Sequence, residues 1–132
     1  MPRKRHLARI AVMQVLFERE TRDVDAEESL ERITEELGNI DQVFAEKLLK
    51  NTLDKEQDLK EVIQKHAPDW SLERMDPIAR SMLLVGAYEL IYGEDAPPAV
   101  VMNEAIEIAK EYGTSESSKF VNGVLNAIAH RT

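Results

Sequence analysis

Three groups of side chains in this sequence are suited to binding a nucleic acid, and the first lies near the N-terminus. Its members are cationic or can become so, and they precede the first acidic residue: Arg3, Lys4, Arg5, His6 and Arg9. Such cations make salt-dependent contacts with phosphates, and an arginine guanidinium also stacks on or hydrogen-bonds an unpaired base. A solubilising tail is the alternative interpretation, because basic clusters are common at chain ends.

The other two groups lie further along the chain. Gln14 occupies the centre of an apolar stripe, where its amide could read a base edge or satisfy a buried backbone group. Residues 118–123 (SKFVNG) combine a cation, an aromatic ring and an amide at the start of a predicted helix, where free N–H groups favour phosphate. The segment alone is a weak signal, because Phe120 on its own would more often be a core residue.

The charge distribution limits what kind of binding site these groups can form. The chain of 132 residues has a net charge of −8, and a broadly negative surface repels phosphates. Asp and Glu dominate residues 18–61, whereas the first nine residues contain four Lys or Arg and no acidic residue. This pattern predicts a localised anion site on an acidic body that is available to a basic partner.

Signals for catalysis, metals and membranes are weak. Cysteine is absent, the three histidines are scattered, and we find neither a Gly-rich phosphate loop nor a Ser/His/Asp arrangement. No apolar segment approaches the length of about 18 residues that a membrane span needs, and the N-terminus does not resemble a secretory signal. We therefore expect a cytoplasmic, non-enzymatic protein without a cofactor or metal.

Helices must position these residues, because apolar residues recur with a period of 3.6 almost everywhere and strand signals are weak. The pattern predicts an all-α protein with these helices: 3–22, 25–37, 41–66, 77–93, 98–112 and 115–128, plus a short turn at 72–75. Strong signals mark several ends, such as Asp76 followed by Pro77. We expect a single domain over 1–132, with an N-terminal helical subdomain at about 1–68 and a C-terminal one at about 69–132.

Several motifs together resemble the NusB family of transcription antitermination factors. The matching segments are 5–9 (RHLAR), 14–17 (QVLF), 75–78 (MDPI), 86–90 (GAYEL), 97–110 (PPAVVMNEAIEIAK), 112–113 (YG) and 118–126 (SKFVNGVLN). The resemblance covers essentially the whole chain. It implies two packed antiparallel three-helix bundles with about seven helices, the seventh being the short turn at 72–75.

The resemblance also implies a function and its partners. Members of the family bind boxA, a short single-stranded RNA element of ribosomal operons, together with the ribosomal protein that acts as NusE. The complex is linked indirectly to elongating RNA polymerase and supports processive transcription of ribosomal RNA. Whether the free protein forms a homodimer is left open.

Site residues follow from the resemblance position by position. The implied RNA contacts are Arg5, His6, Arg9 and Gln14 in the first region and Glu116, Lys119 and Phe120 in the second. Phe17 and Asp76 match positions associated with the protein partner. The family more often has tyrosine at position 17, and more arginines at positions 6 and 7.

Two other classes of function stay open at this point. Residues 109–113 and the helix from Ser115 also resemble a helix-turn-helix motif, which would bind duplex DNA, although its recognition helix would be poor in cations. A purely structural helical adaptor is the other. A similar helical module precedes the catalytic domain of some ribosomal-RNA methyltransferases, but no cofactor-binding domain follows it here, so we do not expect that activity.

Overall fold

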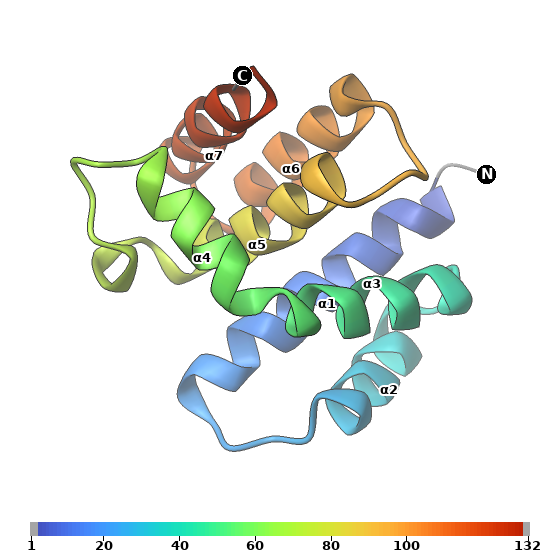
Figure 1. Cartoon of the computed structure of the whole chain (residues 1–132). Helices are drawn as coiled ribbons and strands as arrows, with labels where there is room; N and C mark the ends of the chain where they lie inside the picture. The colour runs from blue at the N-terminus through green and yellow to red at the C-terminus, as the bar shows by residue number, and fades with distance from the viewer. Residues whose placement is uncertain (1–2, 131–132) are drawn as a thin grey trace. The chain divides into compact units, whose positions relative to one another are not determined.

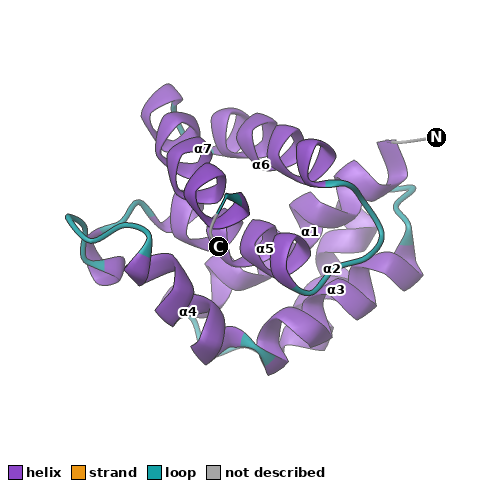
Figure 2. Ribbon diagram, turned by 45° about the horizontal axis from the view of Figure 1, so that its top comes forward, coloured by secondary structure: helices purple, strands orange, loops and turns teal. Residues whose placement is uncertain are grey.

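Helices form all the regular secondary structure in residues 3–130, the part of the chain that the computed structural model describes (Figure 1, Figure 2). The helices are α1 (Arg3–Thr21), α2 (Ala26–Leu37), α3 (Gln42–Asp54), α4 (Glu56–Lys65), α5 (Pro77–Ile91), α6 (Pro98–Tyr112) and α7 (Ser115–Ala129). A short 3₁₀ turn, η1 (Leu72–Arg74), lies between α4 and α5. The all-α prediction is confirmed, as is the expected number of seven helices within the described residues.

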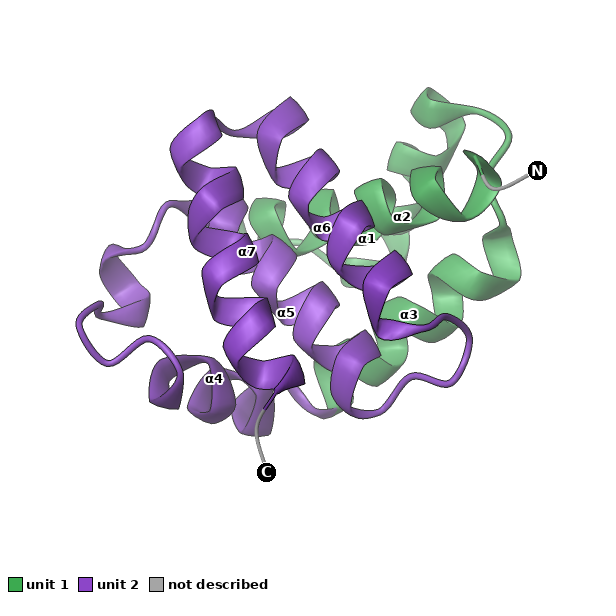
Figure 3. Cartoon of the chain, turned by 90° about the horizontal axis from the view of Figure 1, so that it is seen from above, with its two compact units in different colours: residues 1–54 green, residues 55–132 purple. Residues whose placement is uncertain are grey.

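The chain divides into two compact units, with residues 1–54 in unit 1 and residues 55–132 in unit 2 (Figure 3). In unit 1, α2 and α3 both pack against α1. In unit 2, α5, α6 and α7 pack against one another, and α4 packs against α5 and α7. Unit 1 has the expected three helices, whereas unit 2 has four. The boundary lies before α4 and not near residue 68, because the apolar face of α4 packs in unit 2.

The single helix predicted over residues 41–66 is wrong, because the chain leaves helical geometry at Lys55. This residue has φ −107° and ψ 10°, and it separates α3 from α4. The buried residues of α3 pack in unit 1, whereas Leu59 and Ile63 of α4 pack in unit 2. The seventh helix therefore arises from this break, and the turn at 72–75 is only a 3₁₀ turn.

Helix α1 carries much of the buried apolar surface. Its buried residues lie on nearly all sides and include Ala8, Ile10, Ala11, Val12, Met13, Val15 and Leu16. Helix α1 therefore packs on more than one side. None of the helices in residues 3–130 combines the length and apolar character needed to cross a membrane.

Glu18 connects α1 to α2 in unit 1. Its carboxylate accepts a hydrogen bond of 2.7 Å from the Ser29 hydroxyl and another from the Arg32 guanidinium. A guanidinium nitrogen of Arg22 lies 3.9 Å from the other carboxylate oxygen of Glu18. The Ser29 hydrogen bond, followed by Arg32, lowers the pKa of Glu18 below the ordinary value. The ionised form of Glu18 therefore stabilises this helix pair.

A Glu18→Gln variant is expected to be less stable at neutral pH by about 1 kcal/mol, because it loses the charge that faces Arg32. Since the folded-state pKa is lowered, the Glu18 contribution is present above the unfolded pKa and is lost as pH falls below 4.5 through the folded value. Urea unfolding of the wild type and of Glu18→Gln, from neutral pH to below pH 4.5, measures this difference in stability. Equal stability differences at neutral and acidic pH would contradict the assignment.

Local signals at the start of α5 and α7 act as predicted in unit 2. An oxygen of the Asp76 carboxylate accepts the Ile78 N–H at 3.2 Å and caps α5, and Pro77 occupies the first helical position. Thr114 and Ser117 form a capping box at the start of α7. Helix α7 also passes close to α5: a Cβ at Gly86 would lie 2.8 Å from a Leu125 methyl carbon. The missing side chain of Gly86 therefore lets α5 and α7 approach closely.

Candidate nucleic-acid interface

The N-terminal cations of unit 1 differ widely in exposure. Arg3 and Lys4 are exposed, and the Arg5 side chain is 44% exposed. His6 and Arg9 are buried, at 4% and 3% exposed. Of these five side chains, only Arg3, Lys4 and Arg5 therefore present charge to solvent. The RNA contacts assigned to the buried His6 and Arg9 stay predictions.

Phe44, at the start of α3, lies against both Arg5 and Arg9. The Arg5 guanidinium carbon is 4.7 Å from the centre of the Phe44 ring, and that of Arg9 is 5.1 Å away. Asp41 completes the arrangement, because one carboxylate oxygen accepts the Phe44 N–H at 3.0 Å and the other lies 3.5 Å from Arg5 Nε. The Asp41 N–H also donates to the Lys4 carbonyl at 3.1 Å. The start of α3 thus fixes the first turns of α1.

Gln14 and Phe17 lie one after the other along α1. Gln14 is half-buried. Phe17 is 37% exposed, so part of its ring is open to solvent, as contact with a partner requires. Their assigned roles, RNA contact for Gln14 and partner contact for Phe17, stay predictions.

The second group lies on one face of α7 in unit 2. Glu116, Lys119 and Phe120 follow the i, i+3, i+4 spacing that places side chains together on a helix. Lys119 and Glu116 are exposed. Glu116 lies in the first turn of α7, where a carboxylate interacts favourably with the helix dipole. Phe120 is half-buried and not part of the core. A cation and an aromatic ring are therefore available on the same surface.

An additional aromatic residue, Trp70, extends this surface. Its ring meets Phe120 edge to face, with centroids 5.4 Å apart and planes at 67°. Both rings line a hollow of about 300 Å³ together with Lys119 and Gly123. Trp70 was not predicted from the sequence as a site residue. The available signal was a lone tryptophan in a short loop between Pro68 and Ser71.

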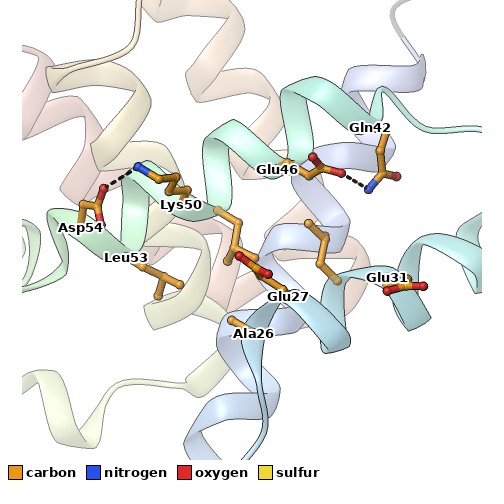
Figure 4. Close-up of a pocket in the computed structure, with 10 residues that line it drawn as sticks. Ala26, Glu27, Glu31, Gln42, Glu46, Lys50, Leu53 and Asp54 are labelled. Atoms are coloured by element: carbon orange, nitrogen blue, oxygen red, sulfur yellow. Dashed lines mark hydrogen bonds and ion pairs between the residues drawn. The ribbon is translucent and has the colours of Figure 1, made fainter.

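A larger hollow lies in unit 1 between α2 and α3, with a volume of about 600 Å³ (Figure 4). Its rim carries four carboxylates and one ammonium group, from Glu27, Glu31, Glu46, Asp54 and Lys50. Lys50 Nζ lies 3.5 Å from a carboxylate oxygen of Asp54, so that single cation is already paired. This negative rim repels phosphate and does not form an RNA site. Within residues 3–130, no group of His, Asp or Glu side chains could hold a metal ion.

Comparison with known proteins identifies the family. The sequence model described as the NusB family matches residues 6–130. The chain belongs to the NusB family. Its similar relatives include the transcription antitermination protein NusB of Lysinibacillus sphaericus, with 41% identity over 93% of this chain and 94% of that protein. The NusB protein of Bacillus subtilis is 40% identical over 95% of this chain and 94% of its own length.

A solved structure is similar over nearly all of this NusB-family chain. It is described as antitermination factors NusB and NusE in complex with double-stranded RNA. The TM-score is 0.87 at 30% sequence identity, covering 98% of each chain. The family resemblance and its all-helical fold are therefore confirmed, whereas the individual site residues stay predictions.

Proposed function

We propose that this protein is a transcription antitermination factor that binds boxA-type single-stranded RNA together with the ribosomal protein acting as NusE. The proposal includes support of ribosomal RNA transcription through an indirect link to RNA polymerase. Family membership and the RNA and NusE named for a similar structure support it. Free bases suit this chain better than duplex RNA, because paired bases do not offer their faces to aromatic rings.

The observation that carries the proposal is the exposed surface of α7. Lys119 stands beside Phe120 and Trp70 in a chain whose net charge is −8. A cation next to exposed aromatic rings is the combination that binds single-stranded nucleic acids, through phosphate contacts and base stacking. Arg3, Lys4 and Arg5 in unit 1 supply further exposed positive charge. We propose that each of these two groups contacts RNA.

Titration of a labelled boxA-like single-stranded RNA, followed by fluorescence anisotropy over a salt series, tests the proposal. We expect binding that tightens when the NusE-type ribosomal protein is added, and weaker binding to scrambled RNA, double-stranded RNA and duplex DNA. Lys119→Ala should weaken binding and reduce the salt slope by about 0.7, the value for one lost phosphate contact on a single strand.

Lys110→Ala is the matched control, because Lys110 is an exposed lysine on the neighbouring helix α6 of the same unit. It should leave affinity and salt slope nearly unchanged. Preference for duplex DNA would favour the helix-turn-helix alternative. If the protein binds no RNA, either alone or with the partner, the structural adaptor is the interpretation that remains.

A further inference from the structure

Trp70 has an exposed ring, and packing within the protein does not explain why the ring lies at the surface. It is 54% exposed, although burial of a tryptophan would stabilise the fold. An edge-to-face contact covers at most one face of each ring, so Phe120 leaves a large part of the Trp70 indole open. This open face borders the 300 Å³ hollow that Lys119 and Gly123 also line.

The loop that carries Trp70 is held in place by hydrogen bonds from α4. The Gln64 side-chain amide donates to the carbonyl oxygens of Ala67, at 3.1 Å, and of Trp70. The side-chain oxygen of Gln64 accepts the Leu72 N–H at 2.9 Å. The Trp70 N–H donates to the Ala67 carbonyl at 3.1 Å. The exposed ring is thus presented by an ordered backbone, which lowers the entropy cost of binding a ligand.

Gly123 is the second unexplained residue on the rim of this hollow. It lies in the interior of α7, where glycine is less favourable than alanine. Apart from its chain neighbours and the backbone of α7, a Cβ at this position would meet no atom within 4 Å, whereas the Cβ of Gly86 would collide with Leu125. Packing within the protein therefore does not require this glycine. An open space beside a cation and two rings is what a close-fitting ligand needs.

We propose that Trp70, Phe120, Lys119 and Gly123 form a subsite that takes one unpaired base of single-stranded RNA. The base stacks on the exposed indole face, Lys119 contacts an adjacent phosphate, and Gly123 leaves room for the ribose and backbone. Asp69 also lines the hollow, so stacking and not net positive charge provides most of the binding there. This inference rests on the proposed function and specifies which residues of that surface hold a single base.

Trp70 is the single tryptophan of the chain, so its fluorescence reports directly on the subsite. The full-length protein is titrated with the boxA-like single-stranded RNA while tryptophan emission and the anisotropy of an RNA label are recorded together. We expect emission to be quenched along the same curve as the anisotropy. If RNA binds by anisotropy while emission stays unchanged, the subsite is wrong and the proposed function stands. If no RNA binds, both are wrong.

Variants separate stacking from an effect on folding. Trp70→Ala should weaken RNA binding about five- to a hundredfold, and Trp70→Phe should recover part of the loss. Gly123→Ala should raise the thermal unfolding temperature and still weaken RNA binding, a combination that loss of structure cannot produce. Tyr92→Ala, which removes an exposed ring placed against Lys55 at the opposite end of α4, should change affinity little.

Abasic substitutions in the RNA, made one position at a time, identify the base. A single position should lower affinity for the wild-type protein and have almost no further effect on Trp70→Ala. This non-additivity is expected only if the ring and that base contact one another. Equal losses for wild type and Trp70→Ala at every position, or unchanged affinity of Trp70→Ala and Gly123→Ala, would overturn the proposal.

Discussion

Replacing Phe44 by alanine is expected to lower the free energy of unfolding by about 3–5 kcal/mol. Phe44 is 7% exposed, and its ring also supports the guanidinium groups of Arg5 and Arg9. Its removal leaves a cavity beside two charges that have lost their aromatic contact. Urea unfolding followed by far-UV circular dichroism measures this loss.

Phe44→Leu separates the core role of the ring from its contact with the arginines. Leucine retains most of the apolar volume, so we expect a loss of only about 1 kcal/mol. It offers no aromatic face, so Arg5 keeps its ion pair with Asp41 and loses its contact with the ring. If the placement of Arg5 matters for RNA, this nearly native variant binds RNA several-fold more weakly. Native affinity and salt slope would show that the ring serves only the fold.

The ends of most helices are predictable because local residues determine them. Asp76 and Pro77 start α5, and Gly38 takes the positive φ of 93° that ends α2. Pro98 and Thr114 similarly mark the starts of α6 and α7. Each signal acts within one turn of helix, so it needs no knowledge of the rest of the fold.

The break at Lys55 could not be predicted from the sequence. Neither glycine nor proline lies nearby, and apolar residues at helical spacing resume at Leu59 after five polar residues. The break follows from packing, since α3 packs in unit 1 and α4 in unit 2. A periodic pattern indicates which face is buried, but not against which helix.

The sequence predicted the residue types of the candidate site, but it did not predict which of these side chains are exposed to solvent. A basic segment signals anion binding, yet the burial of His6 and Arg9 depends on tertiary packing, including that of Phe44 against Arg9. Trp70 joins Phe120 through a loop whose position depends on Gln64. Contacts between residues distant in sequence decide which of the predicted side chains can reach a ligand.

Replacing Asp76 by alanine is expected to lower the free energy of unfolding by about 2–3 kcal/mol. The resemblance to the family predicted that Asp76 contacts the protein partner. Replacing Asp76 would then also remove the cap of α5, in addition to any effect on the partner. The structure adds a second contact, because the Ser117 hydroxyl donates to the carboxylate oxygen that does not cap α5. Asp76 thus ties the start of α5 to the capping box of α7.

Asp76→Asn distinguishes this structural role from a role in binding the partner. Asparagine is as good a helix cap as aspartate, so the variant should keep the bond to the Ile78 N–H and lose only about 1 kcal/mol. Calorimetric titration with the NusE-type protein then tests the charge alone. We expect weaker partner binding by this well-folded variant. Unchanged affinity would mean that Asp76 serves the contact between α5 and α7, and that its assignment to the partner surface is wrong.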